Sequence, residues 1–282
     1  MSTAATCTSQ PISRSCKEEV RNLGAVPLHA DELYPSRQLR DLLPLLAWWL
    51  GQGGIFLLTG EVGCGKTSAL RSFLSQLNPA QARALSLVPP LPSRRAIYRA
   101  ILRALGENPQ GLVADLSAAY VGALTAIAHQ GLRLVLVIDE VQDLPLSVLA
   151  HLRNLLCAPD GSPLAVAVLL SGTQEILQRL QLAPLQPLQQ RVVSACHLTA
   201  LGREELPAYV DHQLRLAGTP AEISPEPVTV LFEHTRGVPR LVSGVLRLAL
   251  RQPAERIGLP ELQAVLRAAG FAVPALTGGK GA

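Results

Sequence analysis

The sequence predicts an α/β protein in which a parallel five-stranded sheet, covered by helices, is followed by a small helical domain. Three observations support this prediction. Short apolar runs alternate with segments of helical periodicity up to about residue 200, which is typical of a parallel sheet. A glycine-rich turn joins the first apolar run to a helix. Beyond Leu201 the strand patterns stop and only helical patterns follow.

These patterns divide the 282 residues into four segments. Residues 1–30 are rich in Ser and Thr and are expected to form a flexible tail. Residues 31–200 form the α/β domain, and residues 201–270 form the helical domain. Residues 271–282 are expected to be a second flexible tail. One α/β domain with a smaller appendage is the natural organisation for a chain of this length.

The strands are expected at five short apolar runs, which comprise residues 55–59, 84–88, 132–138, 164–170 and 192–198. Helices are expected wherever apolar residues recur at helical spacing. In the α/β domain these are residues 37–50, 68–77, 93–105, 114–129 and 146–157. Ser36 and Ser93 are the expected N-caps of two of them. In the C-terminal domain the helices are residues 203–217, 225–235, 239–251 and 259–269.

Composition excludes several classes of protein. The net charge is a modest +4, and 48% of the residues are hydrophobic, which suits a globular core. Five cysteines are scattered without a CxxC pair, and the six histidines lack ligand spacing, which argues against a disulfide framework and a zinc site. No secretory leader opens the sequence, and Pro and Gly interrupt the most apolar stretch, so no membrane span is expected. A cytoplasmic location is therefore predicted.

The glycine-rich turn fits the phosphate-loop pattern GxxxxGK[ST], with a strand before it and a helix after it. Its backbone N–H groups and the following helix N-terminus would hold phosphates. Lys66 would place its ammonium between the β- and γ-phosphates of ATP, and the Thr67 hydroxyl would bind Mg²⁺. A glycine-rich turn without a ligand is the alternative. The expected nucleotide-binding residues of the loop are Gly60, Glu61, Val62, Gly63, Cys64, Gly65, Lys66, Thr67 and Ser68.

A second motif is the apolar run 134–138 followed by Asp139 and Glu140. A buried parallel strand would deliver both carboxylates to the carboxyl edge of the sheet, beside the phosphate loop. Asp139 would hold Mg²⁺, and Glu140 would orient and polarise the water that attacks the γ-phosphate. The alternative is an apolar strand that merely ends in an acidic turn.

Polar residues at two further places are candidates for catalysis. Ser171 or Thr173, at the end of the fourth expected strand, could contact the γ-phosphate, although Thr173 is equally suited to cap a helix. Arg191 precedes the last strand at the rim of the domain, from which it could reach the nucleotide of a neighbouring subunit. Arg240 begins a helix of the second domain and could touch the phosphates of its own subunit. Taken alone, each arginine would more often be a solvated surface charge.

Together these blocks resemble AAA+ ATPases, and among them the group that joins ExeA-type ATPases to transposition helpers of the TniB, TnsC and MuB kind. The resemblance covers roughly residues 34–252 and rests on five blocks in the family's order, which are residues 59–67, 138–144, 171–177, 188–192 and 237–241. It implies a P-loop NTPase (AAA+) fold with a C-terminal helical lid. It also implies that Arg191 is an arginine finger and Arg240 a second sensor. Cys64 departs from the small or hydroxyl residue expected in the loop and could make it sensitive to thiol reagents.

The distribution of charge suggests a partner. No acidic residue occurs between Val62 and Gly106, and Arg95, Arg99 and Arg103 recur every four residues with Arg94 beside them. Such a stripe suits the phosphate backbone of duplex DNA without sequence reading, and in helper ATPases of the resembled kind this segment lines the inner channel of the oligomer. Few aromatic residues are nearby for stacking on single strands. A solvated basic helix face is the alternative.

Two main functions therefore remain open. The first is an ATP-dependent regulator of DNA transposition that forms a homo-oligomeric ring or filament on double-stranded DNA and recruits a transposase. The second is an ExeA-like secretion ATPase, a family expected to carry a transmembrane helix and a further domain. Their absence from this sequence favours the first function. A nucleotide-gated switch without a DNA role is a third, weaker alternative.

Overall fold

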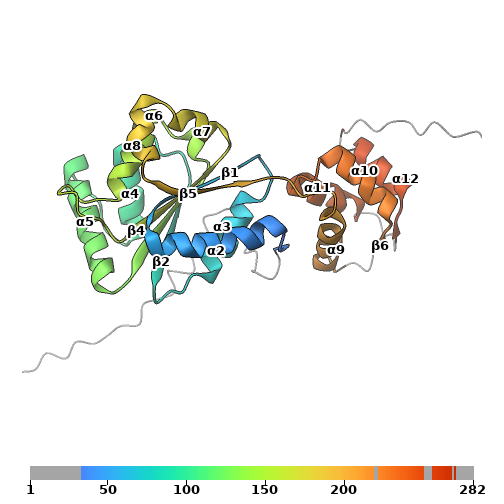
Figure 1. Ribbon diagram of the computed structural model, residues 1–282, viewed down its shortest axis with the longest axis horizontal. Coiled ribbons are helices and arrows are strands. Elements are labelled where there is room, and N and C mark those ends of the chain that lie inside the picture. Colours follow the sequence, from blue (N-terminus) through green and yellow to red (C-terminus); the bar gives the residue numbers. More distant parts are fainter. Residues whose placement is uncertain (1–32, 219–221, 251–255, 269, 271–282) are drawn as a thin grey trace, which may run out of the picture.

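The computed structural model describes residues 33–218, 222–250, 256–268 and 270. The two predicted tails, residues 1–30 and 271–282, lie outside these residues. The described chain forms an α/β domain and a helical lid that lies beyond the end of the last long strand (Figure 1). The predicted fold class is confirmed, because a five-stranded, all-parallel sheet is surrounded by helices and followed by a helical C-terminal part.

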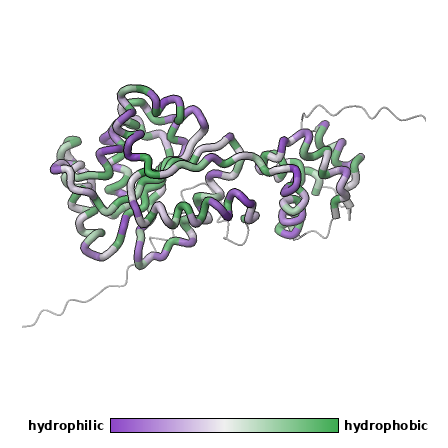
Figure 2. The backbone as a smooth tube through the Cα atoms, in the orientation of Figure 1, coloured by the Kyte–Doolittle hydropathy of each residue, from purple (hydrophilic) through white to green (hydrophobic). Residues whose placement is uncertain are grey.

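The sheet has the strand order β2-β3-β4-β1-β5. Its strands are β1 (Gly54–Gly60), β2 (Ala82–Leu87), β3 (Arg133–Ile138), β4 (Val166–Gly172) and β5 (Val192–Leu198). The three central strands β3, β4 and β1 are almost continuous runs of buried apolar residues, as expected for strands that are covered on both faces. Figure 2 shows this concentration of hydrophobic residues along the middle of the sheet.

Helices cover the two faces of the sheet unequally. One face packs against α2 (Arg37–Gln52) and α3 (Lys66–Gln76), with Trp49 and Phe73 in that core. The other face packs against α4 (Arg94–Ala104), α5 (Val113–His129), α6 (Leu146–Leu152), α7 (Glu175–Leu180) and α8 (Gln186–Gln189). Because successive strand residues point to opposite faces, alternate residues of β4 belong to the two cores.

Several helix signals predicted from the sequence are present as expected. The Ser36 hydroxyl accepts a hydrogen bond from the Leu39 N–H (3.2 Å), and Ser93 does the same for the Ala96 N–H (3.2 Å). The helix expected over residues 146–157 ends earlier, at Leu152, and continues as a 3₁₀ turn, η4 (Arg153–Leu155). The chain then forms an isolated bridge between Cys157 and Pro163, which removes Cys157 from the helix. Two other short 3₁₀ turns, η3 (Val141–Asp143) and η5 (Ala183–Leu185), complete the domain.

In the described part of the C-terminal region, the lid consists of four helices that surround a core of their own. They are α9 (Leu206–Leu216), α10 (Pro225–Thr235), α11 (Pro239–Ala249) and α12 (Leu259–Ala268). The prediction that strands stop beyond Leu201 is wrong, because β6 (Glu222–Ile223) pairs in parallel with β7 (Arg256–Ile257). Strands of two residues are too short to leave an alternating pattern in the sequence.

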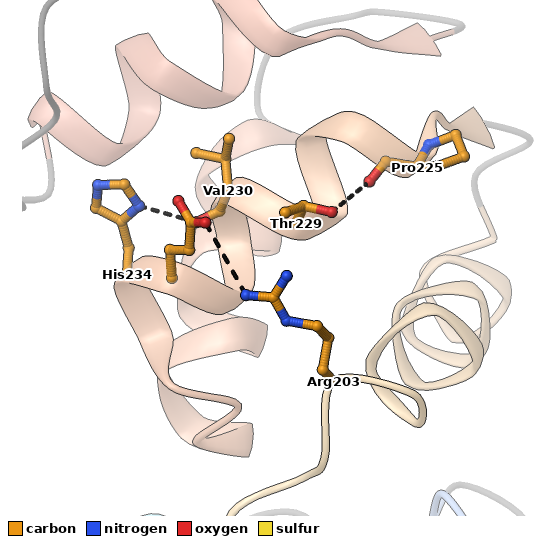
Figure 3. Close-up of polar contacts among 6 residues, drawn as sticks. Arg203, Pro225, Thr229, Val230 and His234 are labelled. Atoms are coloured by element: carbon orange, nitrogen blue, oxygen red, sulfur yellow. Dashed lines mark hydrogen bonds and ion pairs between the residues drawn. The ribbon is translucent and has the colours of Figure 1, made fainter.

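Polar contacts on α10 are mostly local (Figure 3). Thr229 donates to the Pro225 carbonyl (3.2 Å), and the His234 ring bonds the Val230 carbonyl (2.8 Å), each one helical turn away. Arg203 lies 4.0 Å from the Glu233 carboxylate and 5.1 Å from the centre of the Phe232 ring. Both ends of the Arg203–Glu233 pair are more than half exposed, so it adds little stability, of the order of 0–1 kcal/mol.

Candidate active site

The phosphate loop is positioned by close packing around the end of β1. A Cβ atom on Gly60 would lie 2.5 Å from the Leu198 carbonyl oxygen and 2.7 Å from the Cys64 sulfur, so only glycine fits there. Gly65 is the N-cap of α3 and has φ of 105°, a left-handed conformation that glycine adopts without strain. The loop therefore turns tightly from the strand into the helix, and the first N–H groups of α3 have no partner within their own helix.

Lys66 is 5% exposed and donates hydrogen bonds to the carbonyl oxygens of Gly60 (2.9 Å) and Glu61 (3.0 Å). A buried ammonium needs such partners. Because the same ammonium lies beside the unpaired N–H groups at the start of α3, the loop presents several donors and a positive charge in one place. This donor set fits the triphosphate of a nucleotide.

Thr67 and Asp139 join the loop to the end of β3. The Thr67 hydroxyl donates to Asp139 Oδ2 over 2.9 Å, and Asp139 Oδ1 accepts from the Glu140 N–H over 3.0 Å. Asp139 is 4% exposed. A hydroxyl and a single carboxylate are oxygen ligands of the kind Mg²⁺ uses together with substrate phosphates and water, so the pair fits this ion. Among the described residues no group of three His, Cys, Asp or Glu side chains could form a metal cage.

Glu140 follows Asp139 in a left-handed conformation, with φ of 49° and ψ of 44°. A residue with a side chain adopts this region at a cost of about 1–2 kcal/mol, and such strain is common at functional sites. The turn brings the Glu140 side chain to the wall of the cavity described below, where its Oε2 accepts a hydrogen bond from Gln142 Nε2 (2.7 Å). The carboxylate is therefore held in a defined position.

Ser171 and Thr173 lie at the carboxyl end of β4, next to β3 in the sheet. Ser171 is fully buried, and alternation along β4 places it on the face that carries α3 and the phosphate loop. Its hydroxyl oxygen and that of Thr173 are buried and have no hydrogen-bond partner among the described residues. The alternative role of Thr173 as a helix cap is wrong, because α7 begins at Glu175 with Gln174 as N-cap and without a side-chain capping bond.

The lid contacts the loop directly. The Arg240 N–H, at the start of α11, donates to the Gly63 carbonyl over 3.2 Å. A Cβ on Gly63 would lie 2.9 Å from Arg240 Cβ and 3.1 Å from a Val238 methyl carbon, so the absent side chain allows this approach. Arg240 is exposed and lines the same cavity as Lys66. The predicted placement of Arg240 beside the loop of its own subunit is thus consistent with the geometry.

A cavity of about 350 Å³ lies between the two domains. Its phosphate end is formed by residues 62–69 and Glu140. Its other end was not foreseen from the sequence and is formed by Tyr34, Leu39, Tyr209, Gln213 and Ser243. There the Tyr209 hydroxyl bonds the Ser243 hydroxyl (2.7 Å), and the Tyr34 ring lies edge-on to the Tyr209 ring at 5.4 Å. These residues are far apart in the sequence, so no spacing pattern could have identified them.

Arg191 lies at the amino ends of the parallel strands, whereas the phosphate loop lies at their carboxyl ends. Its carbonyl accepts from the N–H of Ile55, at the start of β1, whereas the loop follows the end of β1. The seven residues of β1 separate the two edges by roughly 20 Å. Arg191 is exposed and cannot reach the cavity of its own subunit.

The arginine side chains of the stripe on α4 are only partly exposed and available for a ligand. Arg94, Arg95 and Arg103 are exposed, but the Arg95 guanidinium donates to the Gly111 carbonyl (3.0 Å). Arg99 is half-buried, and its Nε is buried with no partner among the described residues. The role of Arg99 in the predicted DNA-binding stripe stays a prediction; its side chain is half-buried because residue 99 lies next to the buried face of α4.

Cys64 is 8% exposed, and its sulfur faces Gly60. Burial raises the pKa of the Cys64 thiol, and the charge of Lys66 opposes this effect only in part. The thiolate is the nucleophilic form, so the raised pKa lowers the reactivity of this residue. The sensitivity to thiol reagents expected from the sequence is correspondingly reduced.

Comparisons with known proteins agree with this geometry. Residues 50–180 match the family model of the AAA domain. The chain is 33% identical over 223 residues to general secretion pathway protein A of Aeromonas hydrophila, and the match spans 77% of this chain but only 40% of that protein.

Solved structures show the same fold. Cdc6p from Pyrobaculum aerophilum is 19% identical, with a TM-score of 0.66 over 88% of this chain and 71% of that one. The Aeropyrum pernix ORC1 protein in complex with DNA is 17% identical, with a TM-score of 0.62 over 86% of this chain and 68% of that one. Together the comparisons support an AAA+ ATPase. Within the described part of the chain, no helix combines the length and apolar character that a membrane span requires.

We predict that Gly60→Ala lowers stability by about 1–3 kcal/mol, because the new methyl group overlaps the Leu198 carbonyl. Nucleotide affinity should fall with it, since the loop must move. Gly122→Ala on α5 is the matched control, because its Cβ meets no atom within 4 Å. This control should gain about 0.5–1 kcal/mol and bind nucleotide normally. Denaturant unfolding and a nucleotide titration measure both effects; wild-type behaviour of Gly60→Ala would contradict the packing argument.

Proposed function

We propose that this protein, as an AAA+ ATPase, binds and hydrolyses ATP in the cavity between the α/β domain and the lid. The observation that carries the proposal is the convergence of Lys66, the Thr67–Asp139 pair and Glu140 at one edge of the sheet. Lys66 and Thr67 begin α3, which follows β1, whereas Asp139 and Glu140 follow β3, and their proximity results from the parallel arrangement of these strands. They provide a phosphate cradle, a site for a divalent ion and a carboxylate at the cavity wall.

Each group has a distinct proposed role. The backbone N–H groups of residues 60–68 and the Lys66 ammonium bind the phosphates. Glu140 accepts a proton from the attacking water, whose oxygen forms a bond to the γ-phosphorus as the bond to the bridging oxygen of ADP breaks. Ser171 and Thr173 offer buried hydroxyls that can donate to the γ-phosphate, and Arg240 adds a positive charge from the lid. Thr67 and Asp139 hold Mg²⁺, which neutralises phosphate charge when bound.

We predict that Glu140→Gln retains ATP affinity but loses turnover by about a hundredfold or more, because the amide cannot accept the proton of water. Lys66→Ala should lose ATP binding itself. A steady-state assay of phosphate release, paired with a titration of a fluorescent ATP analogue, separates the two effects. Unchanged turnover in Glu140→Gln would show that Glu140 has no catalytic role. Unchanged ATP affinity in Lys66→Ala would show that the phosphate loop does not bind the nucleotide.

We further propose that the active form is a homo-oligomer. Arg191 is exposed at the edge of the sheet opposite its own phosphate loop, so its guanidinium can act only on a different subunit. A ring or filament in which this edge meets the cavity of the next subunit would supply an arginine finger in trans. Heterologous contacts of this kind generate closed rings or open filaments.

A mixing experiment tests this arrangement. Arg191→Ala and Lys66→Ala subunits should each be inactive as pure samples. In an equimolar mixture roughly a quarter of the interfaces combine an intact loop with an intact arginine, so part of the activity should return. Phosphate release measured against the mixing ratio gives the result. If dilute monomeric Arg191→Ala protein hydrolyses ATP at the wild-type rate, the trans role is excluded.

A more specific proposal for this ATPase is that it is a transposition helper, which binds duplex DNA in the ATP state and recruits a transposase. It is supported by the exposed Arg94, Arg95 and Arg103 on α4 and by the absence of acidic residues from Val62 to Gly106. A fold shared with a protein solved in complex with DNA is compatible with this role. Because these arginines lie on one helix and aromatic residues are few, contact with the phosphate backbone fits better than base stacking.

We predict ATP-dependent binding to duplex DNA with little sequence preference and a steep salt dependence, with a log–log slope of about −0.9 for each phosphate contact. Arg94→Glu combined with Arg103→Glu should abolish binding and leave ATP affinity unchanged. Arg40→Glu combined with Arg267→Glu makes the same change of charge elsewhere on the surface and is the control. Fluorescence anisotropy with ATP, ADP and no nucleotide measures these affinities.

A second candidate function is an ATPase of a secretion pathway, which is favoured by the relative from Aeromonas hydrophila. The chain matches about two-fifths of that protein's length, so the comparison concerns only that part of the relative. The DNA experiment separates the two candidates. Absence of DNA binding in every nucleotide state at low salt would exclude the transposition role and leave the secretion role or a nucleotide-gated switch.

A further inference from the structure

Gln142 uses both ends of its side-chain amide to connect two parts of the site. It lies in η3, two residues after Glu140. Its Nε2 donates a hydrogen bond to Glu140 Oε2 over 2.7 Å. Its Oε1 accepts a hydrogen bond from the Thr173 N–H over 3.0 Å. A single side chain therefore bridges the proposed catalytic carboxylate and the end of β4.

The bridge is held in place from two sides. The Gln142 main-chain carbonyl accepts from the Arg179 guanidinium, which also donates to the Leu144 carbonyl over 2.7 Å. On the other side, a Cβ on Gly172 would lie only 2.5 Å from Gln142 Oε1. Glycine at position 172 thus leaves the space that the amide occupies.

The end of β4 is also where two hydroxyls lack a partner. The oxygen atoms of Ser171 and Thr173 are buried and unpaired among the described residues. An unpaired buried hydroxyl costs free energy, so its engagement by a ligand is favourable. Thr173 carries one of these hydroxyls on its side chain and donates its N–H to Gln142. Hydrogen bonds therefore link Thr173 to the same amide that holds Glu140.

We propose that Gln142 is a positioning residue that couples contact between the γ-phosphate and the end of β4 to the orientation of the Glu140 carboxylate. The inference rests on the proposed ATPase function. With Gln142 in place, the carboxylate takes its catalytic orientation only when Ser171 or Thr173 is engaged. Turnover then responds to the γ-phosphate, whereas the affinity for the nucleotide depends on the loop.

Three variants test the bridge. Gln142→Met keeps the length of the side chain and removes both hydrogen bonds. Gln142→Glu keeps an acceptor for Thr173 but removes the donor to Glu140. Gly172→Ala leaves Gln142 intact and displaces its Oε1. Gln178→Ala, an exposed glutamine on α7, is the control. We expect kcat to fall about tenfold to a hundredfold in Gln142→Met and Gln142→Glu and less in Gly172→Ala, with ATP affinity unchanged.

A double variant distinguishes coupling from a general structural role. If Gln142 acts through Glu140, adding Gln142→Met to Glu140→Gln should not slow single turnover further, because the effects of coupled residues are not additive. Additive losses, or a Gln142→Met protein with wild-type kcat, would overturn the inference. So would a fall in ATP affinity that equals the fall in kcat/KM. A wild-type protein that binds ATP without hydrolysing it would instead contradict the proposed function.

Discussion

The hydrogen bond between Thr67 and Asp139 is the contact on which the arrangement of the site depends. It joins the first turn of α3 to the tip of β3, two elements that are more than 70 residues apart in the sequence. β3 and β1 are not neighbours, because β4 lies between them. The side chains therefore meet across the carboxyl edge of the sheet, above the end of β4. This edge is where open α/β sheets bind ligands, because the loops that follow the strands diverge there.

Several buried polar groups of this otherwise apolar domain gather at the same edge of the sheet. Lys66, Asp139 and Ser171 are each at least 95% buried, yet they lie at or beyond the ends of strands made almost entirely of apolar residues. Lys66 and Asp139 are satisfied by hydrogen bonds within the site, whereas the hydroxyls of Ser171 and Thr173 are not. Glu140 adds a left-handed backbone conformation. Unpaired hydroxyls and backbone strain are costs that a purely structural turn would avoid, and their coincidence at one edge fits a binding site.

Much of this could be predicted from the sequence, because the signals are local. Five apolar runs predict the strands. The phosphate loop is recognised by its fixed residue spacing, and Asp139–Glu140 by its position directly after an apolar run. The end of the cavity away from the phosphate loop could not be predicted, because Tyr34 and Tyr209 meet only when the lid folds against the α/β domain. The partial burial of Arg99 could not be predicted for a different reason. Recurrence every four residues places side chains on one stripe, but burial of that stripe depends on how α4 packs against the neighbouring elements.

The two arginines show how far one chain can complete its own site. Arg240 begins α11, and its N–H bonds the Gly63 carbonyl, so movement of the lid changes the surroundings of the phosphate loop directly. Arg191 is fixed at the start of β5, one strand length away from that loop, by the hydrogen bond between Ile55 and its carbonyl. No rotation of the Arg191 side chain closes that gap, and a shift of the lid does not move β5. If Arg191 takes part in hydrolysis, the site is therefore shared between subunits, and assembly and turnover are controlled together.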